Sequence, residues 1–256
     1  MTITLFQQDI LWGNPAANQQ AAERRLAAAP KSDLYVLPEM WSTGFVTQPE
    51  GIAERDESSL SWMKQMASKL DAAIAGSIAT EVAGRYYNRF YFVKPSGEVS
   101  YYDKHHLFTY GGEQLRYTAG GEKVIVTWRG VRFLLQVCYD LRFPIFARNA
   151  AEGPSAYDAA LYVASWPTSR REPWDLLLRA RAIENQAYVC GVNRIGQDSA
   201  CQYNGGTCII DAYGHTQQAC PDGQESAITC TLDLEQLKAF RQKFPVLSDR
   251  DSTSAN

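Results

Sequence analysis

The sequence has few of the residues that form metal sites or disulfide frameworks. It contains three histidines, at positions 105, 106 and 215, and six cysteines, at positions 138, 190, 201, 208, 220 and 230. No two cysteines have the C-x-x-C spacing, and the histidines do not have the spacing of zinc ligands. A Cys/His metal protein is therefore disfavoured, and we expect no metal and no other cofactor.

The sequence also lacks an excess of basic residues and long apolar runs. Its 256 residues include 25 Lys and Arg against 28 Asp and Glu, a net charge of −3. A nucleic-acid-binding domain needs a basic patch, so no nucleic-acid partner is expected. No apolar run reaches about 18 residues, and the N-terminus MTITLFQQDILWG does not resemble a signal peptide. We therefore expect no membrane partner and a cytoplasmic location with reduced cysteines.

Short apolar strands alternate with helices along most of the chain. Helices are expected at 16–29, 59–70, 144–153, 173–186 and 234–244. Turns are expected at Gly84 and Asn88. Strands are expected at 3–7, 34–37, 73–78, 89–94, 98–102, 123–128, 131–137, 159–164, 188–194, 208–211 and 227–233.

This alternation predicts an α/β protein. Because hairpins occur among the alternating elements, mixed sheets are favoured over purely parallel ones. Two such sheets packed face to face, with helices outside, fit the length of the chain. No internal repeat or linker is present. We expect one domain over residues 1–244 and a polar tail over residues 245–256.

The stretch VRFLLQVCYDLRFP, residues 131–144, combines an apolar strand with a polar end. Cys138 follows the apolar run, and Pro144 can open a helix. A thiol at the positive end of a helix has a lowered pKa and a raised reactivity. A buried structural cysteine is the alternative. The polar residues that follow the strand favour a reactive cysteine.

Glu39 and Lys104 share the position of Cys138, because each follows an expected strand. Ligand sites in α/β proteins gather at the carboxyl ends of strands. Glu39 can take the thiol proton, and Cys138 can attack a carbonyl carbon. Lys104 and the backbone N–H of Tyr139 can stabilise the resulting oxyanion. Taken singly, Glu39 and Lys104 are better explained as solvated surface charges, because charged side chains are mostly exposed.

His105 and His106 offer a different general base, as in Cys–His hydrolases. They are consecutive, so at most one of them is expected to face the site. Spacing alone does not decide between this dyad and the Glu-Lys-Cys set.

Three ordered segments, LPEMWSTGF, YYDKHHLF and VCYDLRFP, resemble the signature segments of the nitrilase, or carbon–nitrogen hydrolase, superfamily. The resemblance extends from the first residue to about residue 244. It implies a four-layer α-β-β-α sandwich of two mixed sheets. It also implies a catalytic triad, which falls on Glu39, Lys104 and Cys138.

The resemblance further implies a supporting glutamate between the lysine and cysteine segments. Glu113, in GGEQLRYTAG, matches its place better than Glu122. The alternative for Glu113 is a loop carboxylate that caps nearby amides.

Within the superfamily, MWSTGF, LYVASWP and RARAIENQAYVCGVNRIG are similar to segments of omega-amidases. Those relatives hydrolyse the side-chain amide of 2-oxoglutaramate and 2-oxosuccinamate to ammonia and the 2-oxo acid. A small-molecule amide is therefore the expected partner. The alternatives are a deaminated-glutathione amidase, an N-carbamoyl amidase, or a non-catalytic scaffold that has kept the fold.

An acidic substrate requires a cationic anchor, and a guanidinium suits a carboxylate. The candidates are Arg142 and the pair Arg170 and Arg171. An ion pair of Arg142 with Asp140 or Glu39 is the alternative. Phe45 and Trp166 are expected to line the same pocket. The alternative is that these aromatic residues belong to the core.

The resemblance also implies a homodimer that forms through the helix at 173–186. Its small residues, among them Ala180, Ala182 and the following Ala187, would permit close approach of another helix.

Overall fold

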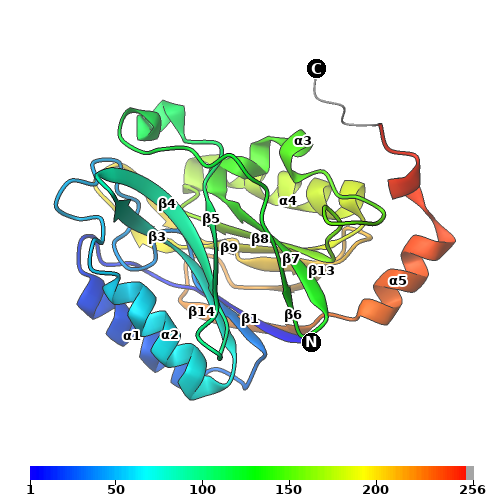
Figure 1. Cartoon of the computed structure of the whole chain (residues 1–256), viewed down its shortest axis with the longest axis horizontal. Helices are drawn as coiled ribbons and strands as arrows, with labels where there is room; N and C mark the ends of the chain where they lie inside the picture. The colour runs from blue at the N-terminus through cyan, green and yellow to red at the C-terminus, as the bar shows by residue number, and fades with distance from the viewer. Residues whose placement is uncertain (252–256) are drawn as a thin grey trace.

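Two six-stranded sheets packed face to face form the centre of the protein (Figure 1). The structure is a computed structural model and describes residues 1–251. The first sheet has the order β14 (Ser226–Thr231), β1 (Thr2–Gln7), β2 (Leu34–Val36), β3 (Ala73–Val82), β4 (Arg85–Val93) and β5 (Val99–Asp103). The second has the order β13 (Thr216–Ala219), β12 (Cys208–Ile210), β9 (Tyr188–Asn193), β8 (Ala159–Ala164), β7 (Val131–Val137) and β6 (Ile125–Trp128).

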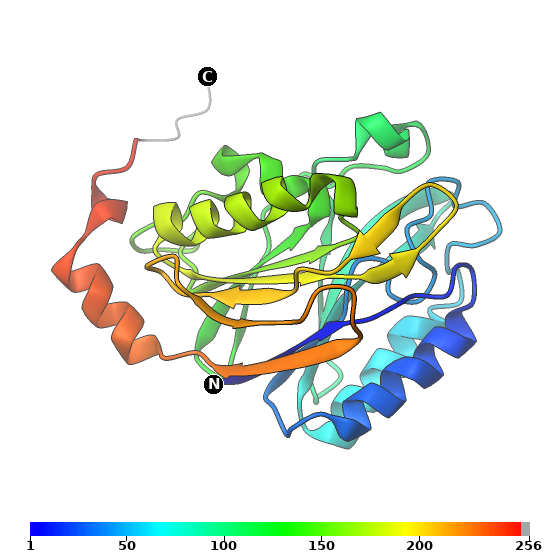
Figure 2. The ribbon, with the colours of Figure 1, turned by 180° about the vertical axis from the view of Figure 1, so that it is seen from behind.

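Helices cover the outer face of each sheet (Figure 2). Helices α1 (Pro15–Ala28) and α2 (Ser58–Leu70) pack on the first sheet, and α4 (Arg171–Asn185) packs on the second. This arrangement confirms the predicted four-layer α-β-β-α sandwich of two mixed sheets. Within residues 1–251, no helix is long and apolar enough to cross a membrane.

The two sheets are built alike. In each, three central strands run parallel, and the flanking strands are antiparallel to them. The apolar runs of the central strands are continuous because these strands are buried on both faces. Between the sheets, the rings of Phe92 and Phe133 lie 5.9 Å apart. The inner faces of the two sheets therefore share one apolar layer. The carboxyl ends of the parallel strands of both sheets border this layer.

Two local predictions are wrong. Strand β3 continues to Val82 and β4 begins at Arg85, so the turn lies at Ala83 and Gly84, both with positive φ. Asn88 is therefore not at a turn: it pairs with Ala79 inside the β3–β4 ladder. Near the nucleophile candidate, α3 (Pro144–Ala147) ends well before the predicted position near residue 153.

The C-terminal strands are also more numerous than predicted. Strands β12 and β13 extend the second sheet, whereas β14 returns to the first and pairs antiparallel with β1. A separate hairpin, β10 (Ile195–Gln197) and β11 (Gln202–Asn204), projects at the end of the molecule opposite α5 (Leu234–Lys243) (Figure 2).

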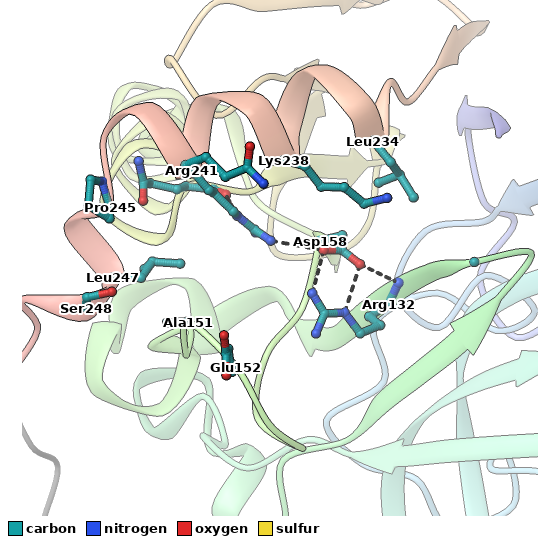
Figure 3. Close-up of a pocket in the computed structure, with 13 residues that line it drawn as sticks. Arg132, Ala151, Glu152, Asp158, Leu234, Lys238, Arg241, Pro245, Leu247 and Ser248 are labelled. Atoms are coloured by element: carbon teal, nitrogen blue, oxygen red, sulfur yellow. Dashed lines mark hydrogen bonds and ion pairs between the residues drawn. The ribbon is translucent and has the colours of Figure 1, made fainter.

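Asp158 joins helix α5 to the second sheet by an ion pair. Asp158, just before β8, accepts hydrogen bonds from Arg132 Nε at 2.9 Å, Arg132 Nη2 at 2.7 Å and Arg241 Nη1 at 3.0 Å (Figure 3). A cavity of about 490 Å³ lies between this contact and residues 245–248. Arg132 and Arg241, two partly exposed arginines that line this cavity, both bind Asp158. Leu247 packs back on the body, and residues 252–256 of the predicted tail lie outside the described residues.

We expect Asp158→Asn to destabilise the protein. Burial acts to raise the pKa of Asp158, but the hydrogen bonds and charge of Arg132 outweigh it and lower the pKa below its ordinary value. The ionised form is thus the one that stabilises the fold, and its loss from a partly buried pair costs about 2 kcal/mol. The melting temperature near neutral pH should fall by about 5 °C.

The pH dependence has a defined sign. Because the folded pKa is depressed, this stabilisation is present above the unfolded value of about 4 and is lost as the pH falls through the folded pKa. Melting curves of wild type and Asp158→Asn should therefore converge in acid. Lys238→Ala, which breaks an exposed pair with Glu235 on the same helix, is the control and should leave melting unchanged. A difference between wild type and Asp158→Asn that persists at low pH would contradict this assignment.

Candidate active site

The structure brings the three strand-end residues together. Glu39 lies just beyond β2 and Lys104 directly after β5, both in the first sheet. Cys138 follows β7 in the second sheet. They meet because the strand ends of both sheets border the same layer. The predicted common location is therefore observed.

Lys104 lies between two carboxylates. Its Nζ donates to Glu39 Oε1 at 3.0 Å and to Glu113 Oε2 at 2.9 Å, and the three side chains are 0% exposed. Asn88 Nδ2 donates to Glu39 Oε1 at 2.8 Å and to Glu113 Oε1 at 3.2 Å. We call Glu39, Asn88, Lys104 and Glu113 the buried cluster. Glu122, the alternative to Glu113, is exposed.

Backbone amides also donate to both carboxylates. Ser165 N donates to Glu39 Oε2 at 2.7 Å, and Phe108 N donates to Glu113 Oε2 at 2.6 Å. Each carboxylate therefore accepts hydrogen bonds on both sides, as a buried charge requires. Both side chains are held in one orientation.

The buried cluster keeps Lys104 protonated. Burial alone would lower the pKa of Lys104, but the charges of Glu113 and Glu39 outweigh it and raise the pKa above its ordinary value. A fixed ammonium is suited to stabilising a developing oxyanion and is unsuited to accepting a proton.

Cys138 lies at a strained turn. It has a φ of 45°, which is rare for a residue with a side chain, and it begins the short 3₁₀ helix η3 (Cys138–Arg142). Asp140 stabilises this turn because its carboxylate accepts from Val137 N at 2.9 Å, Tyr102 OH at 2.8 Å and His106 N at 3.0 Å. The thiol is thereby presented beyond the end of β7.

The expected lowering of the pKa of Cys138 is not observed. Burial and then the charge of Glu39 raise the pKa of the thiol well above its ordinary value, although Lys104 and the backbone of Ser165 act in the opposite direction. The helix that begins here is a five-residue 3₁₀ turn, so its dipole is too short to reverse this effect. The resting thiol is neutral.

Neither neighbouring histidine is placed to act on Cys138. His106 Nδ1 lies 2.8 Å from Asp140 Oδ1, and its ring stacks on Phe143. His105 Nδ1 lies 2.6 Å from the carbonyl oxygen of residue 120, and its ring stacks on Phe146. Both rings have structural partners, and neither lines the pocket at Cys138. The structure therefore does not contain the Cys–His dyad.

A small pocket opens at Cys138, with a free volume of about 50 Å³. Arg142 lies over the ring of Trp166, at 5.0 Å from its centre, and Arg170 lies 5.4 Å from the ring centre of Phe108. Within residues 1–251, neither arginine forms an ion pair. Eleven residues line the pocket: Phe45, Phe108, Cys138, Tyr139, Arg142, Ser165, Trp166, Pro167, Arg170, Cys201 and Tyr203.

Two predictions about the arginines fail. Arg171 does not line the pocket, because it pairs with Asp175 at 2.8 Å and with Asp222 at 2.7 Å. The alternative pairing of Arg142 with Asp140 is also absent, since the Asp140 carboxylate is occupied by the turn at Cys138. Phe45 and Trp166 line the pocket as expected.

Several residues of this site were not predicted from the sequence. Asn88 was predicted to lie at a turn, but it lies inside β4. Only its hydrogen bonds to Glu39 and Glu113 reveal that it belongs to the site. Cys201 and Tyr203 come from the β10–β11 hairpin, for which no strands were predicted. They also line an outer groove of about 780 Å³ that continues from the pocket. The sequence did contain a signal for Ser165, because this residue directly follows a buried strand, as Cys138 does.

Metal-ligating side chains do not gather anywhere in the described chain. Over residues 1–251, no group of three or more His, Cys, Asp or Glu residues is arranged to hold a metal ion. All six cysteines are free thiols. The polar groups at Cys138 are instead arranged around one buried ammonium.

Comparison with known proteins is consistent with this geometry. The family described as carbon-nitrogen hydrolase matches residues 2–242. The chain belongs to this family. It is 42% identical over 252 residues to the omega-amidase YafV of Yersinia enterocolitica, covering 98% of this chain and 97% of that protein. It is 34% identical over 255 residues to the 2-oxoglutaramate amidase of Bacillus subtilis, covering 97% and 96% of the two chains.

Solved structures of this carbon-nitrogen hydrolase family have the same fold. XC1258 from Xanthomonas campestris, a CN-hydrolase superfamily protein with an arsenic adduct in its active site, has a TM-score of 0.96 and 40% identity. The match covers 100% of this chain and 99% of that one. Nit3 from Saccharomyces cerevisiae, of the nitrilase superfamily, has a TM-score of 0.85 and 26% identity, covering 96% and 94%.

We expect Glu39→Gln to make Cys138 easier to alkylate. The charge of Glu39 raises the pKa of the thiol, so its removal should shift the pH profile of reaction with iodoacetamide to lower pH by about one pH unit. Peptide mapping by mass spectrometry separates Cys138 from the other five thiols. Glu122→Gln, outside the pocket, is the matched control. A profile that stays in place or moves to higher pH would show that Glu39 does not set this pKa.

Proposed function

We propose that the protein is an omega-amidase. Its substrates are small monoamides of 2-oxo dicarboxylic acids, 2-oxoglutaramate and 2-oxosuccinamate, and its products are ammonia and the 2-oxo acid. The observation that carries this proposal is the buried cluster beside Cys138, at a pocket that also holds two unpaired arginines. Likeness over nearly the full chain to relatives named omega-amidase and 2-oxoglutaramate amidase supports the substrate class.

In the acylation half-reaction, Cys138 Sγ transfers its proton to a Glu39 oxygen and attacks the amide carbon. The carbonyl oxygen becomes an oxyanion, held by Lys104 Nζ and the backbone N–H of Tyr139. Glu39 then gives the proton to the amide nitrogen. The C–N bond breaks, ammonia leaves, and the acyl group remains on sulfur as a thioester.

In the deacylation half-reaction, water replaces ammonia. Glu39 takes a proton from the water, whose oxygen attacks the thioester carbon, and Lys104 and Tyr139 again hold the oxyanion. The C–S bond breaks, the proton returns from Glu39 to sulfur, and the acid is released. Glu113 acts as a positioning residue, because its contact keeps Lys104 charged and in place.

The raised pKa of Cys138 fits this sequence of steps. A neutral thiol and an ionised Glu39 form the resting pair, so the proton moves only when a carbonyl carbon is present to be attacked. The fixed charge of Lys104 then compensates the negative charge as it moves from sulfur to oxygen.

The size and charge of the pocket support a short acidic acyl group. A free volume of about 50 Å³ leaves no room for a bulky acyl group. Arg142 and Arg170 are the unpaired cations, and they would bind the substrate carboxylate at the mouth of the pocket. The aromatic rings of Phe45, Phe108 and Trp166 close its sides.

An ammonia-release screen tests the proposed function. Purified wild type should release ammonia from 2-oxoglutaramate and 2-oxosuccinamate faster than from glutamine, nitriles or N-carbamoyl amino acids. Deaminated glutathione yields 2-oxoglutarate and a dipeptide and no ammonia, so it is compared with 2-oxoglutaramate by the rate of 2-oxoglutarate release, which should be lower. Cys138→Ala should lose at least about 10⁴-fold in turnover and keep its far-UV circular dichroism spectrum. Preference for a carbamoyl or glutathione-derived substrate would support the corresponding alternative amidase. Full activity of Cys138→Ala would contradict the nucleophile, and no activity on any compound would favour a non-catalytic scaffold.

The carboxylate anchor can be tested with two adjacent residues. Arg170→Met should raise KM for 2-oxoglutaramate at least about tenfold, because a guanidinium–carboxylate pair is lost. Arg171→Met is the matched control and should leave KM unchanged, since Arg171 faces Asp175 and Asp222 instead. Steady-state kinetics measures KM for both variants, with 2-oxoglutaramate that contains no ammonium. A larger effect of Arg171→Met than of Arg170→Met would contradict the pocket assignment.

We also propose a cytoplasmic homodimer. Free thiols at all six cysteines are compatible with a reducing compartment. The outer face of α4 exposes Leu176, at 60%, and Ile183, at 50%, which is an apolar surface suited to a second subunit. Ala182 and Ala187 are buried against their own sheet, so they do not offer the contact first expected of them.

A further inference from the structure

Ser165 lies in direct contact with the proposed general base. It follows β8, which pairs in parallel with β7, so Ser165 and Cys138 leave neighbouring strands at the same edge. Ser165 N donates to Glu39 Oε2 at 2.7 Å. Ser165 also lines the pocket that contains Cys138. Its hydroxyl has no role in the mechanism described so far.

The Ser165 hydroxyl is buried and has no partner. The residue is 6% exposed, and its Oγ forms no hydrogen bond with any protein atom of residues 1–251. Buried hydroxyls in proteins are almost always hydrogen-bonded, because an unsatisfied one costs free energy. An unpartnered hydroxyl in a ligand pocket is therefore a candidate for hydrogen bonding to the ligand.

Hydrogen bonds with Asn193 hold the backbone of Trp166, the residue that follows Ser165. Trp166 N donates to Asn193 Oδ1 at 2.8 Å, and Asn193 Nδ2 donates to Trp166 O at 2.9 Å. The indole Nε1 of Trp166 donates to Arg170 O at 2.6 Å. The backbone of Ser165 is thus fixed between Glu39 and this reciprocal pair, so the residue that carries the hydroxyl is held at the pocket before a ligand binds.

The mechanism restricts where the leaving nitrogen can lie. Glu39 must reach that nitrogen to protonate it, and the second oxygen of Glu39 is bound to Ser165 N. The nitrogen is therefore held close to Ser165 as well as to Glu39. An amide nitrogen presents two N–H groups, and a serine hydroxyl oxygen is an acceptor for one of them.

We propose that Ser165 Oγ accepts a hydrogen bond from the NH₂ group of the substrate and makes the site selective for carboxamides over esters. The proposal rests on the amidase function above. As Glu39 protonates the nitrogen, its N–H groups become stronger donors, so the hydrogen bond strengthens in the transition state. An ester leaving group has no N–H at this position and gains nothing from the hydroxyl.

The test compares two acyl donors that yield the same thioester. Wild type and Ser165→Ala are each placed in excess over 2-oxoglutaramate or the omega-methyl ester of 2-oxoglutarate. Single turnovers are quenched, and 2-oxoglutarate is measured with glutamate dehydrogenase and added ammonium. Excess enzyme makes slow ester reactions measurable, and an ester carbonyl is intrinsically more electrophilic than an amide. Ser165→Ala should lower the amide rate about tenfold or more and leave the ester rate within about threefold.

Two controls separate this role from a structural one. Ser169→Ala removes an exposed hydroxyl beside the outer groove and should change neither rate. Because the Ser165 hydroxyl has no protein partner, Ser165→Ala should melt at or above the temperature of wild type. Equal losses on amide and ester, or an unchanged amide rate, would overturn the Ser165 assignment alone. Wild type inactive on every amide would overturn the proposed function and this proposal with it.

Discussion

One buried ammonium between two carboxylates is the constraint on which the site depends. An isolated charge in the interior is strongly unfavourable, and Lys104 is tolerated because Glu39 and Glu113 both contact it. The carboxylates in turn need the donors that Asn88 and Ser165 N supply. Ser165 belongs to the second sheet and the others to the first or its loops. The cluster is therefore complete only when the two sheets have packed together.

Burial and the excess negative charge of this cluster together raise the pKa of Cys138, the proposed nucleophile. Two carboxylates against one ammonium leave a net charge near the thiol that, with burial, raises the pKa of Cys138. In the proposed mechanism the thiolate therefore forms within the reaction, with Glu39 as the acceptor of its proton. The positive φ of Cys138, stabilised through Asp140, places sulfur at the cluster without any help from a long helix dipole. Geometry and a nearby base here replace the low thiol pKa expected from the sequence.

The parts of the site that sequence predicts are those with local signals. Glu39, Lys104 and Cys138 each follow an apolar strand, and that position is visible in the order of residues. Asn88 was missed because asparagine in a polar stretch is typical of a turn, whereas its partners are distant in sequence. Arg170 and Arg171 are adjacent, and only the start of α4 turns one to the pocket and the other to Asp175. Tertiary contacts decided both cases.

The rigid and the variable parts of the site come from different structural elements. The buried cluster and Ser165 are held by strand ends of the sandwich, so they define the bond that is broken. The outer groove is made by loops: residues 45–52, the segment that contains Tyr110, and the β10–β11 hairpin with Cys201 and Tyr203. Loops accept substitution without loss of the core. Differences in acyl group between members of the family are therefore expected to arise in these three loops, while the chemistry proposed at Cys138 is retained.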